Sequence, residues 1–185
     1  IGRLVGRITV DDVMDEVREQ AERDYQLASG LSQDVETDDS VLRQTSARLP
    51  WLLIGMLGGI GNSMILGNFD TTFAAHPEMA LYIPLIGGTG GNVGTQSSAL
   101  VVQGLANSSL DANNTWKQIL KESVVALINA TIISMLVYIY NFVRFGPTAT
   151  VSYSVSLSLF AVVMFASIFG TLVPMTLEKL KIDPA

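Results

Sequence analysis

Long uncharged stretches dominate the chain from residue 49 onward and predict helices that cross a membrane. Charged side chains are absent from four runs, at residues 49–69, 79–110, 123–143 and 145–177. A spanning helix needs about 20 predominantly apolar residues, and helices of soluble proteins rarely stay uncharged on every face for so long. The pattern predicts a membrane domain over residues 49–185 with four transmembrane helices, at about residues 49–69, 79–106, 120–143 and 153–177.

The first 48 residues follow a different pattern. Residues 1–10 alternate loosely between apolar and other positions, which is typical of a short strand. An acidic amphipathic helix is expected over residues 11–30, because Thr9 precedes Asp12 at capping-box spacing and Gly30 is a C-terminal stop signal. Residues 31–48 are polar and predict a linker. The expected fold class is therefore an all-α polytopic membrane protein preceded by a short strand and an acidic helix.

The positions of the basic residues predict the orientation in the membrane. Arg43 and Arg48 precede the first run, Lys117 and Lys121 lie between the second and third, and Lys179 follows the fourth. The loop at residues 70–78 contains no lysine or arginine. Because short cytoplasmic loops are enriched in basic residues, the N-terminus is expected in the cytoplasm.

Composition excludes several functional classes. The chain has 185 residues, a formal net charge of -6, 49% hydrophobic residues, one histidine and no cysteine. The acidic balance argues against nucleic-acid binding. Without cysteine there is no thiolate metal site or thiol nucleophile, and no nucleophile–base pair is visible, so an enzyme is not expected.

The most informative stretch is the glycine-rich segment at residues 84–106. Small residues repeat there at helical spacing, and such residues let helix backbones approach closely within a membrane. For the glycines we expect helix packing beside a pore; they are Gly87, Gly90, Gly91 and Gly94. Asn92, Thr95, Gln96 and Ala99 are the candidates for lining a pore. The alternative is that the polar side chains only form interhelical hydrogen bonds.

The acidic helix has two possible roles. Its candidate metal ligands are Asp12, Asp15, Glu19 and Glu22, which recur at spacings of three and four. Like charges one helical turn apart repel each other, and a divalent cation between two such surfaces would relieve that repulsion. The alternative is a solvated acidic face stabilised by the helix dipole.

These motifs resemble one known family. Pro84 through Gln96, which reads P-L-I-G-G-T-G-G-N-V-G-T-Q, is similar to the signature of the MgtE family of magnesium channels. The sequence R-L-P-W-L from Arg48 resembles that family's entry into the membrane, and residues 2–15 resemble the end of its second CBS domain. Residues 1–10 would then be the C-terminal remnant of a CBS domain, and residues 11–30 the connecting, or plug, helix.

The resemblance implies a homodimer in the bacterial inner membrane that passes hydrated Mg²⁺ along the dimer interface. It also implies gating by cytosolic Mg²⁺ bound between the acidic helix and the CBS domains, with Asp12 and Asp15 at sensing positions. The family has five transmembrane helices per subunit, so we expect a fifth helix, carrying the pore carboxylate, beyond Ala185. The alternatives are a secondary carrier for another divalent cation or a metabolite, and a non-conducting membrane assembly module.

Overall fold

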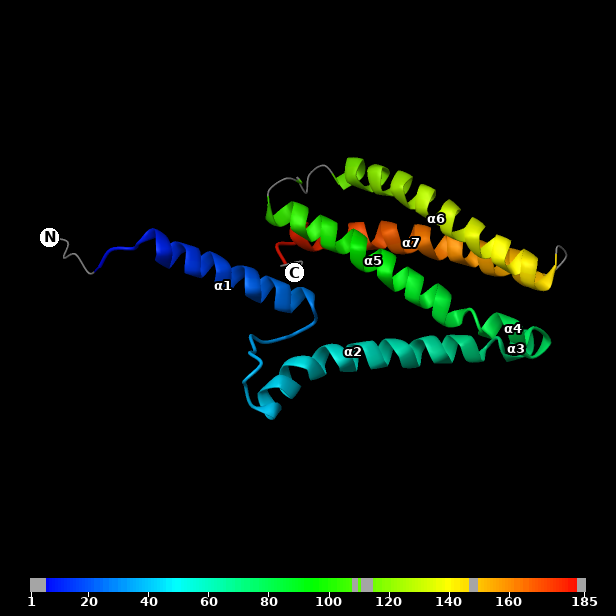
Figure 1. Cartoon of the computed structure of the whole chain (residues 1–185), viewed down its shortest axis with the longest axis horizontal. Helices are drawn as coiled ribbons and strands as arrows, with labels where there is room; N and C mark the ends of the chain where they lie inside the picture. The colour runs from blue at the N-terminus through cyan, green and yellow to red at the C-terminus, as the bar shows by residue number, and fades with distance from the viewer. Residues whose placement is uncertain (1–5, 108–109, 111–114, 147–149, 183–185) are drawn as a thin grey trace. The chain divides into compact units, whose positions relative to one another are not determined.

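The computed structural model describes residues 6–107, 110, 115–146 and 150–182, and the chain divides into two compact units after Gly67. All regular structure in these residues is α-helical (Figure 1). Of the strand expected over residues 1–10, residues 1–5 lie outside the described part. Residues 6–9 have no regular structure, and Val10 already belongs to a helix. An extended segment needs a neighbouring strand to satisfy its backbone groups, and the described residues offer none.

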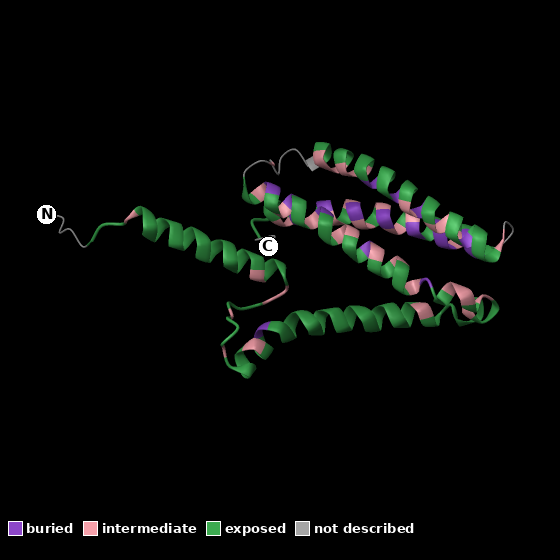
Figure 2. Cartoon of the chain, in the orientation of Figure 1, coloured by how far each residue is buried: buried purple, intermediate pink, exposed green. Residues whose placement is uncertain are grey.

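In the first unit, α1 (Val10–Ala28) has both ends defined by local signals. The backbone N–H of Asp12 donates to the Thr9 hydroxyl at 3.2 Å, and the N–H of Thr9 donates to the Asp12 carboxylate at 2.7 Å, which completes the expected capping box. At the other end Gly30 has a φ of 83°, and the N–H groups of Gly30 and Leu31 donate to the carbonyls of Leu27 and Gln26. This is a Schellman motif, which favours glycine because its central residue is left-handed. No residue of α1 is buried (Figure 2).

The second helix of this unit, α2 (Val41–Gly67), begins before the uncharged run at residue 49 does. Once a helix is nucleated, each further residue adds one hydrogen bond. The polar residues before the apolar run, which include Arg43 and Arg48, can therefore continue the same helix toward the N-terminus. Pro50 lies inside α2. Along α2 the large apolar side chains are exposed except that of Leu66, which is partly buried, and Ala47 is the buried residue.

The second unit contains α3 (Asp70–Ala75), α4 (Pro77–Ala80), α5 (Ile83–Ala106), α6 (Thr115–Phe145) and α7 (Thr150–Lys179). The three long helices run antiparallel in succession, and both α5 and α6 pack along α7 (Figure 1). The helix α7 is therefore the centre of this unit.

The core of the second unit follows one stripe of α7. Val151, Val155, Leu159 and Val163 recur at every fourth residue and are nearly or fully buried. This is the i, i+4 spacing that places side chains on one face of a helix. They pack against Tyr82 before α5 and Ala130 of α6, with partly buried apolar neighbours from α5 and α6.

Three helices among the described residues are long and apolar enough to cross a membrane: Val41–Gly67, Trp116–Phe145 and Thr150–Lys179. The sequence pattern predicts four. The exception is α5, whose 24 residues span about 36 Å at 1.5 Å per residue, more than the roughly 30 Å hydrocarbon core. Its glycines and amide side chains reduce its apolar character, so α5 meets the length requirement and not the compositional one.

Candidate functional site

The glycine-rich helix α5 has two opposite faces. Its buried residues are Gly90, Ser97, Val101 and Gly104. With 3.6 residues per turn, these four positions lie within about 60° of one another around the helix axis. The four candidate pore-lining residues, Asn92, Thr95, Gln96 and Ala99, are all exposed, and their positions centre about 180° from the buried stripe. The candidates therefore share one open face, which we call the polar face of α5.

Glycines allow α5 to approach α7 closely. A Cβ atom built on Gly170 of α7 would lie 2.6 Å from the carbonyl oxygen of Gly94, and one built on Gly90 would lie 2.6 Å from a methyl carbon of Val162. Side-chain carbon at these positions would overlap with the neighbouring helix. By contrast, a Cβ on Gly87 or Gly91 meets nothing within 4 Å.

The four glycines predicted to pack beside a pore line a groove of about 500 Å³ together with α7. The α7 wall of this groove is mostly apolar and includes Phe165 and Phe169, whose rings stack with centroids 4.2 Å apart. Gly90 and Gly94 thus lie where α5 meets α7, whereas Gly87 and Gly91 border open space.

A second pocket, of about 330 Å³, has both polar and apolar lining residues and lies among α5, α6 and α7. Its lining includes Glu122 of α6, whose carboxylate accepts hydrogen bonds from the hydroxyls of Ser97 and Ser167 at 2.7 and 2.6 Å. Gln96 of the polar face also lines this pocket. The sequence pattern assigned no role to Glu122, because it adjoins the uncharged run that begins at Ser123, and nothing in the sequence links it to two distant serines.

The acidic candidates on α1 share one side of that helix. The positions of Asp12, Asp15, Glu19 and Glu22 lie within about 80° around the axis. Asp12 bonds to Thr9, Glu19 pairs with Arg23, and Glu22 pairs with Arg18 at 3.0 Å. Within the described residues, no group of three or more histidine or acidic side chains is arranged to hold a metal ion. A cation at this face would therefore need ligands from a further surface.

The Thr9 hydroxyl and backbone N–H, which donate to the Asp12 carboxylate, lower the pKa of Asp12 below its usual range. Because the folded pKa is the lower one, Asp12 stabilises the start of α1 above its unfolded pKa of about 4, and this contribution is lost as the pH falls through the folded value. We expect Thr9→Ala to raise the pKa of Asp12, measured by NMR titration of its carboxyl carbon. Ser29→Ala at the other end of α1 is the control and should leave the titration unchanged; equal titrations in T9A and the parent would contradict the capping assignment.

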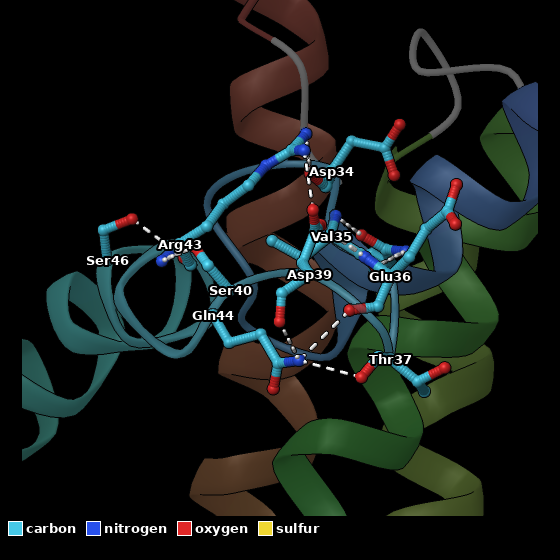
Figure 3. Close-up of polar contacts among 10 residues, drawn as sticks. Asp34, Val35, Glu36, Thr37, Asp39, Ser40, Arg43, Gln44 and Ser46 are labelled. Carbon is cyan, nitrogen blue, oxygen red and sulfur yellow. Dashed lines mark hydrogen bonds and ion pairs between the residues drawn. The ribbon is translucent and has the colours of Figure 1, made fainter.

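Side chains bonded to backbone groups hold the connection between α1 and α2. The Gln44 amide donates to the carbonyls of Glu36, Thr37 and Asp39 at 3.1–3.2 Å, and Arg43 donates to Asp39 and to the carbonyl of Asp34 (Figure 3). From α1, the Gln26 amide both donates to and accepts from the backbone of Val35, at 2.9 and 3.0 Å. The linker expected from polar composition is thus an ordered turn tied to both helices.

Comparison with known proteins agrees with these features. The sequence model of the MgtE family, described as divalent cation transporter, matches residues 83–185, which include α5, α6 and α7. A protein named magnesium transporter MgtE from Bacillus subtilis is 31% identical over 182 residues, covering 98% of this chain and 40% of that protein. The protein of the same name from Thermus thermophilus is 34% identical over 190 residues, covering 100% of this chain and 41% of its own length. A third, from Enterococcus faecalis, is 30% identical over 182 residues.

The present chain thus spans about two-fifths of the length of the curated relatives it matches. The match to the family model covers more than half of the chain and contains both the polar face of α5 and the helix α7 that packs behind it. The chain belongs to the MgtE family of divalent cation transporters, which are membrane proteins.

Proposed function

We propose that this chain forms the pore-bearing part of a magnesium transporter of the bacterial inner membrane, in which Mg²⁺ passes between two copies of the chain. The observation that carries the proposal is the polar face of α5, where Asn92, Thr95 and Gln96 are exposed. Polar side chains at membrane depth normally face a protein interior or a water-filled path. A second copy related by two-fold symmetry would cover this face with the same face of its own. The relatives named as magnesium transporters supply the choice of ion.

The chemistry of the polar face suits a hydrated ion. Mg²⁺ loses its water ligands reluctantly and usually keeps several of them. Amide and hydroxyl oxygens can accept hydrogen bonds from those waters without adding charge, and Ala99 leaves room beside them. Asn92, Thr95 and Gln96 would therefore guide the hydrated ion and shape its path.

The acidic face of α1 is proposed to sense cytosolic Mg²⁺. When Mg²⁺ is abundant, ions between this face and a second acidic surface would hold the transporter closed; when it is scarce, repulsion between the surfaces would open it. A cytoplasmic α1 is supported by the basic residues Arg43 and Arg48, because basic residues favour the cytoplasmic side. The hydrogen bonds from the Gln26 and Gln44 side chains to the backbone of the linker would transmit movement of α1 to α2.

Uptake in cells tests the proposed activity. The full-length protein should restore growth of a bacterial strain that depends on added Mg²⁺, and membrane patches that contain it should carry a current that high cytosolic Mg²⁺ suppresses. Absence of both rescue and current, with the protein present in the membrane, would overturn the magnesium assignment and favour an assembly module.

Gating is tested by removing the two leading acids of α1. We expect the Asp12→Ala, Asp15→Ala double variant to keep conducting at cytosolic Mg²⁺ concentrations that close the parent, because two anionic ligands are lost. Patch recordings across a series of Mg²⁺ concentrations measure the shift. Asp24→Ala is the matched control, since Asp24 lies about 120° around the helix from Asp12 and should leave inhibition intact. Inhibition of the double variant at the parent concentration would count against the sensor.

Transport of another divalent cation is the second candidate, because the description of the family names divalent cations without restricting them to magnesium. A competition experiment distinguishes the two candidate functions. An excess of Mg²⁺ should abolish uptake of Mn²⁺ or Co²⁺ if the path selects Mg²⁺, and should reduce it only in proportion to concentration if the path accepts all three.

A further inference from the structure

Three helices meet at one carboxylate in the second unit. Glu122 of α6 accepts hydrogen bonds from Ser97 of α5 and Ser167 of α7, and the two hydroxyl oxygens lie 3.0 Å apart. Both serines are almost completely buried, with 4% and 2% of their surface exposed. Carboxylates accept hydrogen bonds strongly when they are ionised, so this oxygen is a directional link among helices that also pack through apolar and small residues and through the hydrogen bond from Tyr82 to Asn141.

The contact between α5 and α7 needs such a link. It is formed by Gly90 and Gly94 against Val162 and Gly170, whose backbones and small side chains have no directional preference. Close packing of this kind excludes side chains from the contact by overlap, but it forms no hydrogen bond that sets the rotation of α5 within that limit. Ser97 lies on the buried stripe of α5, so its bond to Glu122 opposes rotation in either direction.

We propose that Glu122 is a positioning residue that fixes the rotation of α5 and thereby directs its polar face toward the ion path. The role rests on the proposed function, because the polar face matters only if it lines that path. Rotation of α5 away from this angle would turn Asn92 and Gln96 from the path toward α7 or α6. Neither Ser97 nor Glu122 needs to touch the ion to have this effect.

Thiol reactivity measures the rotation directly. This segment has no cysteine, so single cysteines can be placed at Ala99 on the polar face and at Val101, which is 1% exposed on the buried stripe. The full-length protein is used, with any cysteine elsewhere replaced by serine. In the parent, a maleimide should modify A99C much faster than V101C. This holds wherever Ala99 faces water, because the thiolate is the form that reacts.

Loss of the acceptor should reduce that ratio. We expect Glu122→Ala to lower the A99C to V101C rate ratio about tenfold, the change that corresponds to leaving a buried hydroxyl without its partner. Glu122→Gln keeps a carbonyl oxygen that can accept from both serines, and should restore most of the ratio. Ser97→Ala removes the bond between α5 and Glu122 with a smaller change in volume, and tests the proposal if E122A does not fold. Glu178→Ala, which removes an exposed carboxylate of α7, is the matched control.

An unchanged rate ratio in folded E122A and S97A would overturn the positioning role. Mg²⁺ uptake by the same variants separates this result from the proposed function. If the parent transports no Mg²⁺, the proposed function fails while the rate ratios still report the rotation. If the parent transports Mg²⁺ and E122A does not, the rate ratio decides. A ratio that falls in E122A and recovers in E122Q supports the positioning role. Loss of uptake in E122A with the rate ratio of the parent contradicts it.

Discussion

Replacing Gly170 with alanine should destabilise the second unit by about 1–3 kcal/mol, the usual cost of inserting a methyl group into a close-packed contact. The new Cβ would lie 2.6 Å from the Gly94 carbonyl oxygen and 3.1 Å from the Ser97 Cβ. The nearest atom belongs to a helix backbone, so no side-chain rotation can remove the overlap. The helices α5 and α7 must separate, which also strains the bonds of Ser97 and Ser167 to Glu122.

Thermal unfolding of the purified full-length protein in detergent measures this effect. Gly88→Ala is the matched control, since a Cβ on Gly88 meets nothing within 4 Å and alanine favours the helix by about 1 kcal/mol over glycine. G170A should therefore melt at a lower temperature than the parent, and G88A at the same or a higher one. Equal melting of G170A and the parent would show that α5 and α7 do not pack this closely in the membrane.

Removing oxygen atoms from the polar face of α5 should reduce Mg²⁺ flux about 10- to 100-fold for each position. Each oxygen is proposed to accept a hydrogen bond from a water polarised by Mg²⁺, and a charge-assisted hydrogen bond contributes about 1.5–3 kcal/mol. Asn92→Leu and Thr95→Val both preserve side-chain size while they remove the polar atoms that face the proposed path. Flux is measured by uptake of Mg²⁺ into vesicles that contain the full-length variant, normalised to the amount of protein inserted.

The control for this prediction makes the same chemical change elsewhere. Thr131→Val removes a hydroxyl from α6, where Thr131 bonds to the carbonyl of Leu127 in its own helix. We expect uptake of T131V to match the parent. Parent-level uptake in both N92L and T95V would exclude the polar face as part of the ion path.

Much of the helical pattern is predictable from sequence because its causes are local. Uncharged runs long enough to span a bilayer predicted helices where α2, α5, α6 and α7 lie. The capping box of Thr9 with Asp12 and the left-handed Gly30 mark the two ends of α1 through contacts within a few residues. Of the expected strand, residues 6–9 form none, since no strand lies beside them in the described part of the chain. The span count differs from the predicted four because α5 has less apolar composition than a typical span.

The structure of the polar linker could not be predicted from local sequence patterns. Composition predicted a linker over residues 31–48; residues 31–40 form no helix, whereas residues 41–48 already belong to α2. The ordered turn arises because Gln26 and Gln44 bond to backbone groups of the loop. Every residue has a backbone carbonyl that can accept a hydrogen bond. Nothing in the sequence therefore distinguishes these two glutamines from glutamines that are exposed to solvent.

The sequence by itself determined that this is a helical membrane chain of the MgtE family, with small and polar residues concentrated in one helix. Only the tertiary structure decided which side of α5 is packed and which is open, since that choice depends on Gly170 and Val162 of a helix far along the chain. It also brought Glu122 to serines 25 and 45 positions away. Hydrophobic periodicity reflects burial of apolar area, which is not directional, whereas a hydrogen bond requires two particular groups to meet in space.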